Sequence, residues 1–421
     1  MAKQSPQKIV DKLAGEAKDA ALQLQSASQR KVNKALTTMA TLCIRKKAVI
    51  QKENRKDLAA AKKKGLSDAM INRLTLSDKV INSMVEGLKV VSKLSTPIGR
   101  KFDRRVRPNK LEIYKMKVPI GVVGIIYESR PNVTVDAAAI CLKSQNAVIL
   151  RGGSEAIHSN RILTDLFSQA LRTAGLPKAA VQIIPITDRA AVNELLQRDD
   201  HIDVIIPRGG EALIKTVVEN SRIPVIKHYK GVCHVYISKR ADMEKAMPIA
   251  VNAKVQRPGV CNAMETLLLD AGLSHKKKHA LIEALLENNV TLCGDKESRK
   301  LSPRIKAATK ADWEAEYLDL RLAVKIVDGV AGAIDHINTF GSHHTDAIVS
   351  ESKKEIDLFR TQIDSSSVMV NASTRFSDGG EYGMGCEIGI STDKLHARGP
   401  MGVEDLVTYK WIAEGNGQIR E

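Results

Sequence analysis

Hydrophobic and polar positions follow three successive patterns along this chain. Residues 5–95 carry apolar positions at helical spacing and predict three or four amphipathic helices, with Gly65 and Gly87 as breaks. Residues 111–118 then alternate apolar and charged side chains, which is typical of a half-exposed strand. Such a strand could pair with another subunit or with the C-terminal tail. From residue 120 onward, short apolar runs alternate with amphipathic stretches.

The third pattern predicts a first α/β unit. We expect strands at residues 121–127, 147–150, 181–184 and 204–206, and helices at 133–143, 154–173, 190–196 and 211–219. Buried strands that alternate with helices predict a parallel, doubly wound sheet. Ligands of such sheets bind at the carboxyl ends of the strands, so the loops after residues 150 and 206 are the first candidates for a site.

A second α/β unit is expected after residue 237, extending to about residue 370. Its predicted elements are strands at 264–269 and 322–327, helices at 242–254 and 275–287, and a further segment at 340–349, whereas the apolar run at 234–237 precedes the unit. At 421 residues the chain is long for one domain, and two domains agree with that length.

The net charge of +17 raises the question of nucleic-acid binding, and its distribution argues against it. Residues 1–110 hold 26 Lys or Arg against 9 Asp or Glu, whereas the remainder holds 39 of each. The excess lies in helical stretches such as 45–47 and 62–64, without interleaved aromatics or a nucleic-acid motif. We interpret these stretches as solvated helix faces that steer anionic ligands at most modestly.

Cysteine usage and hydropathy indicate the compartment. The six cysteines, at positions 43, 141, 233, 261, 293 and 386, are scattered and form no C-x-x-C pair. This spacing favours reduced thiols in a cytoplasm over a disulfide framework or a zinc site. The longest apolar runs are too short to cross a bilayer, and the N-terminus has no apolar signal core, so no membrane association is expected.

Cys261 is the main candidate for chemistry. It lies on a Pro-Gly turn, in the sequence VQRPGVCNAMET, between a predicted helix and a predicted strand. A thiol on such a loop can act as a nucleophile, and the nearby cations Arg257 and Lys254 would favour its thiolate form. A lone cysteine is also commonly a small buried apolar residue, so the spacing alone leaves both interpretations open.

Two loops at predicted strand ends share the sequence Arg-Gly-Gly. One runs from Leu150 to Ser154 and the other from Pro207 to Glu211. Glycines allow a close backbone approach, helix N-termini bind phosphate, and arginine suits bidentate phosphate contacts. A nucleotide site is one interpretation and ordinary strand-to-helix turns are the other. Neither loop matches G-x-G-x-x-G or a P-loop.

The remaining motifs carry less chemistry. His343 and His344 are adjacent and should point in opposite directions, and no further ligand recurs at metal spacing, so we expect no metal site. The glycine-rich stretch at residues 379–389 follows no buried strand and is interpreted as a loop.

Longer motifs make the chain similar to the gamma-glutamyl phosphate reductases of the aldehyde dehydrogenase superfamily. The resemblance extends from about residue 5 to residue 411. Its motifs are VPIGVVGIIYESRPNVT, VILRGG, IPRGG, QRPGVCNA, GSHHTD and KLHARGPMG, at residues 118–134, 148–153, 206–210, 256–263, 341–346 and 394–402.

The resemblance implies an aldehyde dehydrogenase-like α/β fold. We expect N-terminal helices and an NADP-binding domain at residues 1–238, with strand 111–118 in a small oligomerisation sheet. A catalytic domain at 239–373 and an oligomerisation tail at 374–421 follow.

The resemblance also implies the reaction. NADP(H) reduces L-glutamyl 5-phosphate to L-glutamate 5-semialdehyde and phosphate, the second step of proline biosynthesis, through a thioester on Cys261. The backbone N–H of Cys261 would help to hold the oxyanion. Aldehyde-oxidising relatives carry a Glu-Leu-Gly-Gly base that hydrolyses the thioester, and here the matching stretch is His228-Tyr-Lys-Gly231. A reductase does not need a base that activates water, because hydride consumes its thioester.

Further site residues follow from the resemblance. Asn132 is the candidate oxyanion side chain. The cofactor is expected to bind at the two Arg-Gly-Gly loops, through Arg151, Gly152, Gly153, Ser154, Arg208, Gly209 and Gly210. A carboxylate should hold the nicotinamide ribose, and the two candidates for it are Glu316 and Asp319. Arg151 could receive a 2′-phosphate, which favours NADP over NAD. The substrate loops would contribute His344, Asn371, Ser373 and Arg375.

Three alternatives were weighed. Other acyl-phosphate reductases open with a glycine-rich turn, whereas this chain opens with helices. An aldehyde-oxidising dehydrogenase is disfavoured by the missing base, and a nucleic-acid-binding scaffold is disfavoured by the intact Cys261 motif. The expected partners are the small-molecule substrate, delivered by a glutamate 5-kinase, and a second copy of the chain in a homodimer or higher oligomer.

Overall fold

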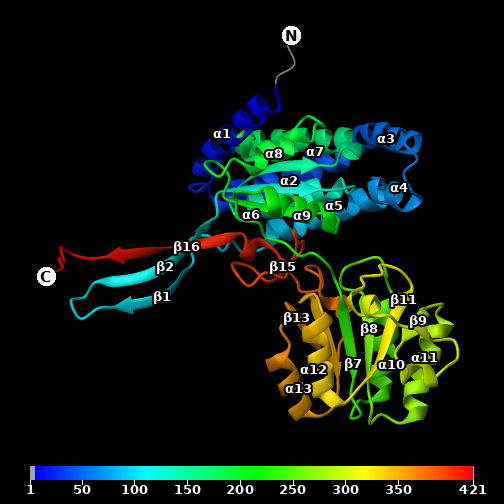
Figure 1. The fold of residues 1–421 in the computed structure, drawn as a ribbon. Coiled ribbons are helices and arrows are strands. Elements are labelled where there is room, and N and C mark those ends of the chain that lie inside the picture. The colour runs from blue at the N-terminus through cyan, green and yellow to red at the C-terminus, as the bar shows by residue number, and fades with distance from the viewer. Residues whose placement is uncertain (1–4, 421) are drawn as a thin grey trace. The chain divides into compact units, whose positions relative to one another are not determined.

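The computed structural model describes residues 5–420, and the described chain forms two compact units (Figure 1). Unit 1 lies within residues 5–227, 383–389 and 401–420, and unit 2 consists of residues 228–382 and 390–400. The first boundary therefore falls at residue 227 rather than at the expected 238, because the strand at 233–237 belongs to the sheet of unit 2. The functions assigned to the segments 1–238, 239–373 and 374–421 stay predictions.

Unit 1 contains a four-stranded parallel sheet in the order β5-β4-β3-β6. Its strands are β3 (Val122–Tyr127), β4 (Ala147–Gly152), β5 (Val181–Ile183) and β6 (Val204–Arg208). The helices that connect or follow them are α6 (Asn132–Lys143), α7 (Ile157–Ala174), α8 (Ala190–Leu196) and α9 (Glu211–Asn220). Every residue of β3 and β4 is buried, which confirms the doubly wound sheet that the apolar runs predict.

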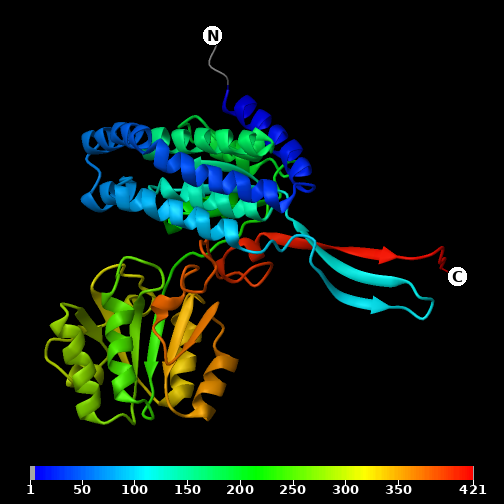
Figure 2. The same cartoon turned by 180° about the vertical axis from the view of Figure 1, so that it is seen from behind.

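The N-terminal segment forms five helices rather than three or four. They are α1 (Pro6–Leu24), α2 (Gln29–Arg45), α3 (Lys47–Lys63), α4 (Asp68–Leu74) and α5 (Asp78–Lys93). Four of them begin after a serine whose hydroxyl accepts a helix N–H, namely Ser5, Ser28, Ser67 and Ser77. Figure 2 shows α2 and α5 as the outer layer on one face of unit 1, where α2 contacts α7 and α5 contacts α6.

The expected break at Gly87 is wrong, because Gly87 lies inside α5. A Cβ atom at this position would lie 2.8 Å from the sulfur of Cys386, so the glycine permits close packing instead of ending the helix. Gly65, with a φ of 71°, does follow the end of α3.

A three-stranded antiparallel sheet extends from the helices of unit 1 (Figures 1 and 2). It contains β1 (Lys101–Val106), β2 (Glu112–Pro119) and β16 (Val407–Glu414) in the order β1-β2-β16. β16 pairs with β2 along its whole length, so the expected strand at 111–118 does pair with the C-terminal tail. Its role in oligomerisation stays a prediction.

Unit 2 contains a seven-stranded parallel sheet in the order β10-β9-β11-β8-β7-β12-β13. The strands are β7 (Cys233–Ile237), β8 (Met264–Asp270), β9 (Thr291–Gly294), β10 (Lys306–Ala307), β11 (Arg321–Val327), β12 (Thr345–Val349) and β13 (Ser367–Val370). The helices are α10 (Met243–Val255), α11 (His275–Glu287), α12 (Gly329–Phe340) and α13 (Lys353–Gln362). A short sheet of β14 (Gly389–Ser391) and β15 (Gly399–Met401) completes the strands.

Alternate residues of the central strands build two separate cores in unit 2. Leu267 and Leu269 of β8 join the core that contains α10 and α11 residues, whereas Leu268 joins the core that contains α12 and α13 residues. Successive side chains of a strand point to opposite faces, so a sheet covered on both sides needs continuous apolar runs. In Figure 1 the two helix pairs flank this sheet accordingly.

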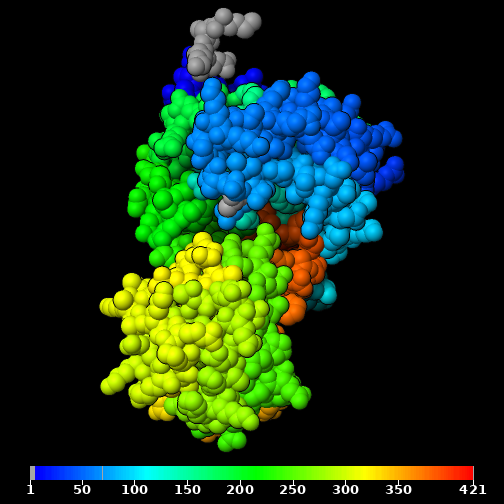
Figure 3. Space-filling view, turned by 90° about the vertical axis from the view of Figure 1, so that its right-hand side faces the viewer, coloured from blue at the N-terminus to red at the C-terminus, as the bar shows by residue number. Residues whose placement is uncertain are grey.

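The basic helices of unit 1 present their lysines to solvent. Arg45, Lys46 and all of residues 62–64 are exposed, as expected for a solvated face, and Figure 3 shows these N-terminal helices, in blue, at the surface of unit 1. Among the described residues, no helix combines the length and apolar character that spanning a membrane requires.

Candidate active site

The candidate nucleophile Cys261 lies at the amino edge of the seven-stranded sheet. It is half-buried on the turn between α10 and β8. Because β7, β8, β11 and β12 are all parallel, the residues that precede them meet at this same edge. Residues 228–231, Glu316 and His344 all precede one of these strands. The site residues therefore gather at the amino edge of this sheet. Ligands of open α/β sheets usually bind at the other edge, at the carboxyl ends of the strands.

Two backbone contacts fix the position of Cys261. A Cβ atom at residue 231 would lie 2.0 Å from the carbonyl oxygen of Cys261, so only glycine fits there. The thiol of Cys233, which is fully buried, donates to the same carbonyl oxygen at 3.2 Å. The turn that carries the candidate nucleophile is thus pressed against the start of β7.

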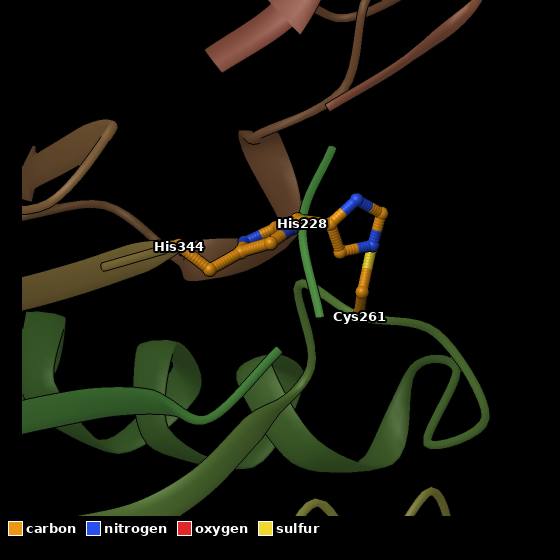
Figure 4. A group of neighbouring side chains, drawn as sticks. All are labelled: His228, Cys261 and His344. Carbon is orange, nitrogen blue, oxygen red and sulfur yellow. The ribbon is translucent and has the colours of Figure 1, made fainter. Parts of the chain in front are cut away.

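Two histidines lie beside the thiol of Cys261. The ligand atoms of His228, Cys261 and His344 lie within 4.8 Å of one another, and Figure 4 shows the sulfur next to the ring of His228. His228 Nδ1 donates to the carbonyl oxygen of Ile390 at 2.9 Å, because a carbonyl can only accept. Nε2 is then the nitrogen with a lone pair. His344 is fully buried and its ring meets that of His228 edge to face, at 5.6 Å between centroids.

The neighbouring histidines at 343 and 344 diverge, as expected. His343 is exposed and bonds through Nδ1 to the carbonyl oxygen of Asp364, whereas His344 Nδ1 lies 2.9 Å from the hydroxyl of Thr345. The sequence carries no further ligand at metal spacing from His344, but the structure brings His228 and Cys261, which are distant in sequence, next to it. Linear spacing could not show this group.

A buried ion pair brackets the turn of Cys261. Lys254, in the last turn of α10, donates to Glu265 of β8 at 2.6 Å, and both side chains are completely buried. Lys254 therefore balances the charge of Glu265 and is not available as the cation for the thiolate. Burial raises the pKa of Glu265 to about 7, although Lys254 acts in the opposite direction.

The structure separates the two candidate carboxylates for a nicotinamide ribose. Glu316 accepts the N–H of Gly231 at 3.0 Å, directly beside the contact between Gly231 and Cys261. Asp319 is exposed and accepts the N–H of Leu320 within its own turn. Of the two carboxylates, Glu316 is the one that bonds to the backbone beside Cys261.

Arg375 supplies positive charge near the thiol. Its Nε donates to Gln256 at 2.8 Å, at the start of the Cys261 turn. Burial lowers the pKa of Arg375, and the positive charge of Arg257 lowers it further, whereas Cys261 acts in the opposite direction. Ser373 is buried and caps the 3₁₀ turn Thr374–Phe376 that holds Arg375. These residues favour an anionic ligand at this edge.

Asn371 does not belong to this group. It follows the carboxyl end of β13, at the opposite edge of the sheet from Cys261. Its amide oxygen accepts from the N–H of Ser350 and its amide nitrogen donates to the carbonyl of Ser350, both at 3.0 Å. Asn371 therefore holds the end of β12 and lies apart from the residues around Cys261.

In unit 1 the two Arg-Gly-Gly loops flank the end of β3. Tyr127 pairs with Gly152 on one side and with Arg208 on the other, so both loops lie at the carboxyl edge, as predicted. The sequence reasoning missed Glu128, whose carboxylate accepts the N–H of Gly210 at 3.1 Å. A side chain at residue 209 would meet the same carboxylate, at 2.5 Å.

Arg151 is buried at the end of β4. Its guanidinium is buried, one amino group bonds to the carbonyl of Thr187 at 3.3 Å, and the other bonds to the carbonyl of Gly152. Within residues 5–420 its Nε has no hydrogen-bond partner. At residue 152 packing requires a glycine, since a Cβ atom there would lie 2.1 Å from the amide nitrogen of Asn160. Gly153 and Ser154 begin the 3₁₀ turn before α7.

Asn132 lies in unit 1, as the first residue of α6. Its amide donates to Asp136 at 3.1 Å, one helical turn further on. Its proposed part in oxyanion binding stays a prediction. Burial raises the pKa of Asp136 to about 6, while the bond from Asn132 opposes the shift.

The raised pKa of Asp136 predicts a pH-dependent effect on stability. A carboxyl whose folded pKa exceeds its unfolded value contributes stability below about pH 4 and loses it as the pH rises through 6. We expect Asp136→Asn to stabilise unit 1 by about 1–2 kcal/mol at pH 7.5 and to be neutral at pH 4.5. Thermal unfolding at both pH values measures this difference. Equal destabilisation at both would show that the carboxylate itself is required.

Comparisons with known proteins agree with this architecture. The aldehyde dehydrogenase family matches residues 2–318. A gamma-glutamyl phosphate reductase of Geobacter metallireducens is 51% identical over 409 residues, which cover 97% of this chain and 98% of the relative. The crystal structure of gamma-glutamyl phosphate reductase from Thermotoga maritima superposes with a TM-score of 0.95 at 39% identity, over 98% of this chain and all of that one.

A more distant structure shares the fold alone. An engineered glycolyl-CoA reductase with bound NADP⁺ has a TM-score of 0.69 at 16% identity, over 96% of each chain. Aldehyde dehydrogenases use a nicotinamide dinucleotide, so the chain is an NAD(P)-dependent oxidoreductase by family. The extent and level of identity show that the chain belongs to the gamma-glutamyl phosphate reductases, within the aldehyde dehydrogenase family.

Proposed function

We propose that this protein reduces L-glutamyl 5-phosphate to L-glutamate 5-semialdehyde with NADPH and releases phosphate, the second step of proline biosynthesis. One observation carries the proposal. The thiol of Cys261 is held on a fixed turn beside the imidazole of His228, at an edge that also carries Arg375. A thiol, a base and a cation are the groups that acyl transfer from an acyl phosphate requires.

Cys261 acts as the nucleophile in this proposal. His228 Nε2 takes the thiol proton, because Nδ1 is committed to the carbonyl of Ile390. The sulfur forms a bond to the acyl carbon, the bond from carbon to the phosphate oxygen breaks, and phosphate leaves with its electron pair. The backbone N–H of Cys261 stabilises the oxyanion, and a thioester remains on the sulfur.

NADPH, held through Arg151, the loop at residues 208–210 and Glu316, would supply the hydride that reduces the thioester on Cys261 to a thiohemiacetal. The carbon–sulfur bond then breaks, the aldehyde forms, and the sulfur leaves as a thiolate that His228 can reprotonate. The stretch that matches the general-base motif of the oxidising relatives is His228-Tyr-Lys-Gly231, and it contains no carboxylate. His228 lies beside the sulfur, and the matching stretch supplies no carboxylate to activate a water, so in this proposal the thioester persists until hydride arrives.

The substrate carries anionic groups that the cationic side chains of the site can bind. Arg375 is held toward this edge by Gln256 and Ser373, and Arg257 adds a second positive charge. We assign these arginines to the carboxylate or the phosphate of the substrate, with His344 beside the reacting carbonyl. Glu316 is the residue that we assign to the nicotinamide ribose.

The preference for NADP over NAD rests on unit 1. Arg151 keeps a buried Nε without a partner among the described residues, and Arg189 is near enough to lower its pKa, although burial is the larger cause. Arg151 at the end of β4 and Arg189 before α8 would supply two guanidiniums for a 2′-phosphate, although the carboxylates of Glu155 and Asp188 are also close to Arg151 and act in the opposite direction on its pKa. The loop of Arg208, Gly209 and Gly210 would bind the pyrophosphate at the start of α9 once Glu128 releases the N–H of Gly210.

The partners follow from the same proposal. A glutamate 5-kinase supplies the acyl phosphate, which hydrolyses readily in water. Two copies of the chain would associate through the β1-β2-β16 sheet, whose exposed residues include Phe102, Tyr409 and Trp411. All six cysteines are free, which agrees with a reducing cytoplasm.

The reverse reaction gives the sharpest test of the proposed function. We expect NADP⁺ to be reduced when glutamate semialdehyde and phosphate are both present, and not when phosphate is omitted, because residues 228–231 lack the carboxylate with which the oxidising relatives hydrolyse the thioester. Absorbance of NADPH measures the rate, and parallel assays with NAD⁺ test the cofactor preference. Rapid release of glutamate without phosphate would contradict the proposal.

A further inference from the structure

The group of His228, Cys261 and His344 has the composition of a transition-metal site. Each residue comes from a different loop at the amino edge of the sheet in unit 2, and their ligand atoms lie within 4.8 Å of one another (Figure 4). One thiolate and two imidazoles are ligands that Zn²⁺ prefers. In a tetrahedral zinc site such atoms are about 3.5 Å apart, so the side chains need to move by only about 1 Å.

His228 is already arranged as metal-bound histidines are. Its Nδ1–H donates to the carbonyl of Ile390, which fixes the tautomer and leaves the lone pair on Nε2. Histidine ligands of metals commonly donate their other N–H to such a carbonyl. His228 lies in a segment, residues 226–232, that forms neither helix nor strand.

We infer that this group binds one Zn²⁺ reversibly and that the bound ion blocks the enzyme. The group found among the described residues has three members, so the fourth position falls to water or another small ligand. Structural zinc sites use four protein ligands and catalytic sites use three. Here one of the three ligands is the thiolate of the candidate nucleophile, so a bound ion would occupy the group that the proposed reaction needs. The binding follows from the geometry alone, whereas the inhibition rests on the proposed function of Cys261.

Metal binding can be measured without substrate. Co²⁺ titrated into the full-length protein should bind once per chain and produce a near-ultraviolet band from thiolate-to-cobalt charge transfer. Zn²⁺ should displace Co²⁺, protect Cys261 from alkylation by iodoacetamide and inhibit turnover, with full reversal by EDTA. A missing charge-transfer band, or alkylation of Cys261 at the same rate with Zn²⁺ present, would overturn the inference.

Variants of the ligands test the assignment. We expect His228→Ala and His344→Ala each to weaken Zn²⁺ binding by about 100-fold, measured against a chromophoric chelator. His343→Ala is the matched control, because this exposed neighbour bonds to the carbonyl of Asp364 and lies outside the group, so its affinity should equal that of the wild type. Circular dichroism checks that each variant is folded, and the half-buried His228 gives a test that does not depend on replacing the buried His344.

The metal titration and the enzyme assay test the two proposals independently. An active enzyme that binds Zn²⁺ equally well with and without His228 would overturn the metal site and leave the proposed function in place. Zn²⁺ that binds at Cys261 in a protein without reductase activity would support the site and contradict the proposed function.

Discussion

Replacement of Cys261 by alanine should abolish turnover while NADP(H) binding stays near normal. The thiol forms the thioester in the proposed reaction, and loss of a catalytic nucleophile costs about 10⁴-fold in rate or more. The dinucleotide is expected to bind at loops of unit 1, which do not include this residue. Steady-state assays measure the loss, and fluorescence titration with NADPH measures the binding.

Cys386→Ala provides a matched control for this experiment. Cys386 is half-buried like Cys261, but it belongs to unit 1 and packs against Gly87 of α5. Its variant should retain activity. Mass spectrometry of wild-type protein mixed with acyl phosphate in the absence of NADPH should find a glutamyl adduct on Cys261. Turnover by Cys261→Ala, or an adduct at another cysteine, would refute the role of the thiol.

Lys254→Met should destabilise unit 2 by about 3–5 kcal/mol. The substitution leaves the carboxylate of Glu265 fully buried without its partner, and such a charge is costly. Unfolding in urea, followed by tryptophan fluorescence, measures the change. The chain has two tryptophans, so a background of Trp411→Phe leaves Trp313 as a reporter within unit 2.

A double variant separates the lost ion pair from lost packing. Lys254→Met combined with Glu265→Leu should recover most of the stability, because two apolar groups of similar size replace a buried pair at little cost. Lys245→Met is the control, since the ion pair of Lys245 with Glu351 is exposed and should contribute little. A double variant as unstable as Lys254→Met alone would show that packing, and not the unpaired charge, causes the loss.

Much of the fold was predictable because its signals are local. The buried runs of β3, β4 and β6 and the helices α8 and α11 were expected within a few residues of their observed bounds. β1 was missed, because its sequence, KFDRRV, carries charges on both faces and resembles a basic linker. A strand that is exposed on nearly every residue leaves no alternating pattern to detect.

The candidate site was only partly predictable for a physical reason. Cys261 and His344 stand in recognisable motifs, but the contact between His228 and Cys261 depends on which strands are neighbours, and that is a property of the whole sheet. The stretch at residues 228–231, which matches the general-base motif of the oxidising relatives, contains His228. Its imidazole was the one feature of the sequence that could have indicated a base at the site. The ion pair of Lys254 and Glu265 was hidden because either residue alone is typical of a solvated surface.

The location of Cys261 at the amino edge also determines where unit 2 can be altered without harm. The loops at the other end of the strands lie about 20 Å away, the length of the seven-residue β8. The turn after β8, at residues 271–274, is partly exposed and supplies no candidate site residue. A fluorophore or affinity tag attached there should leave the chemistry undisturbed.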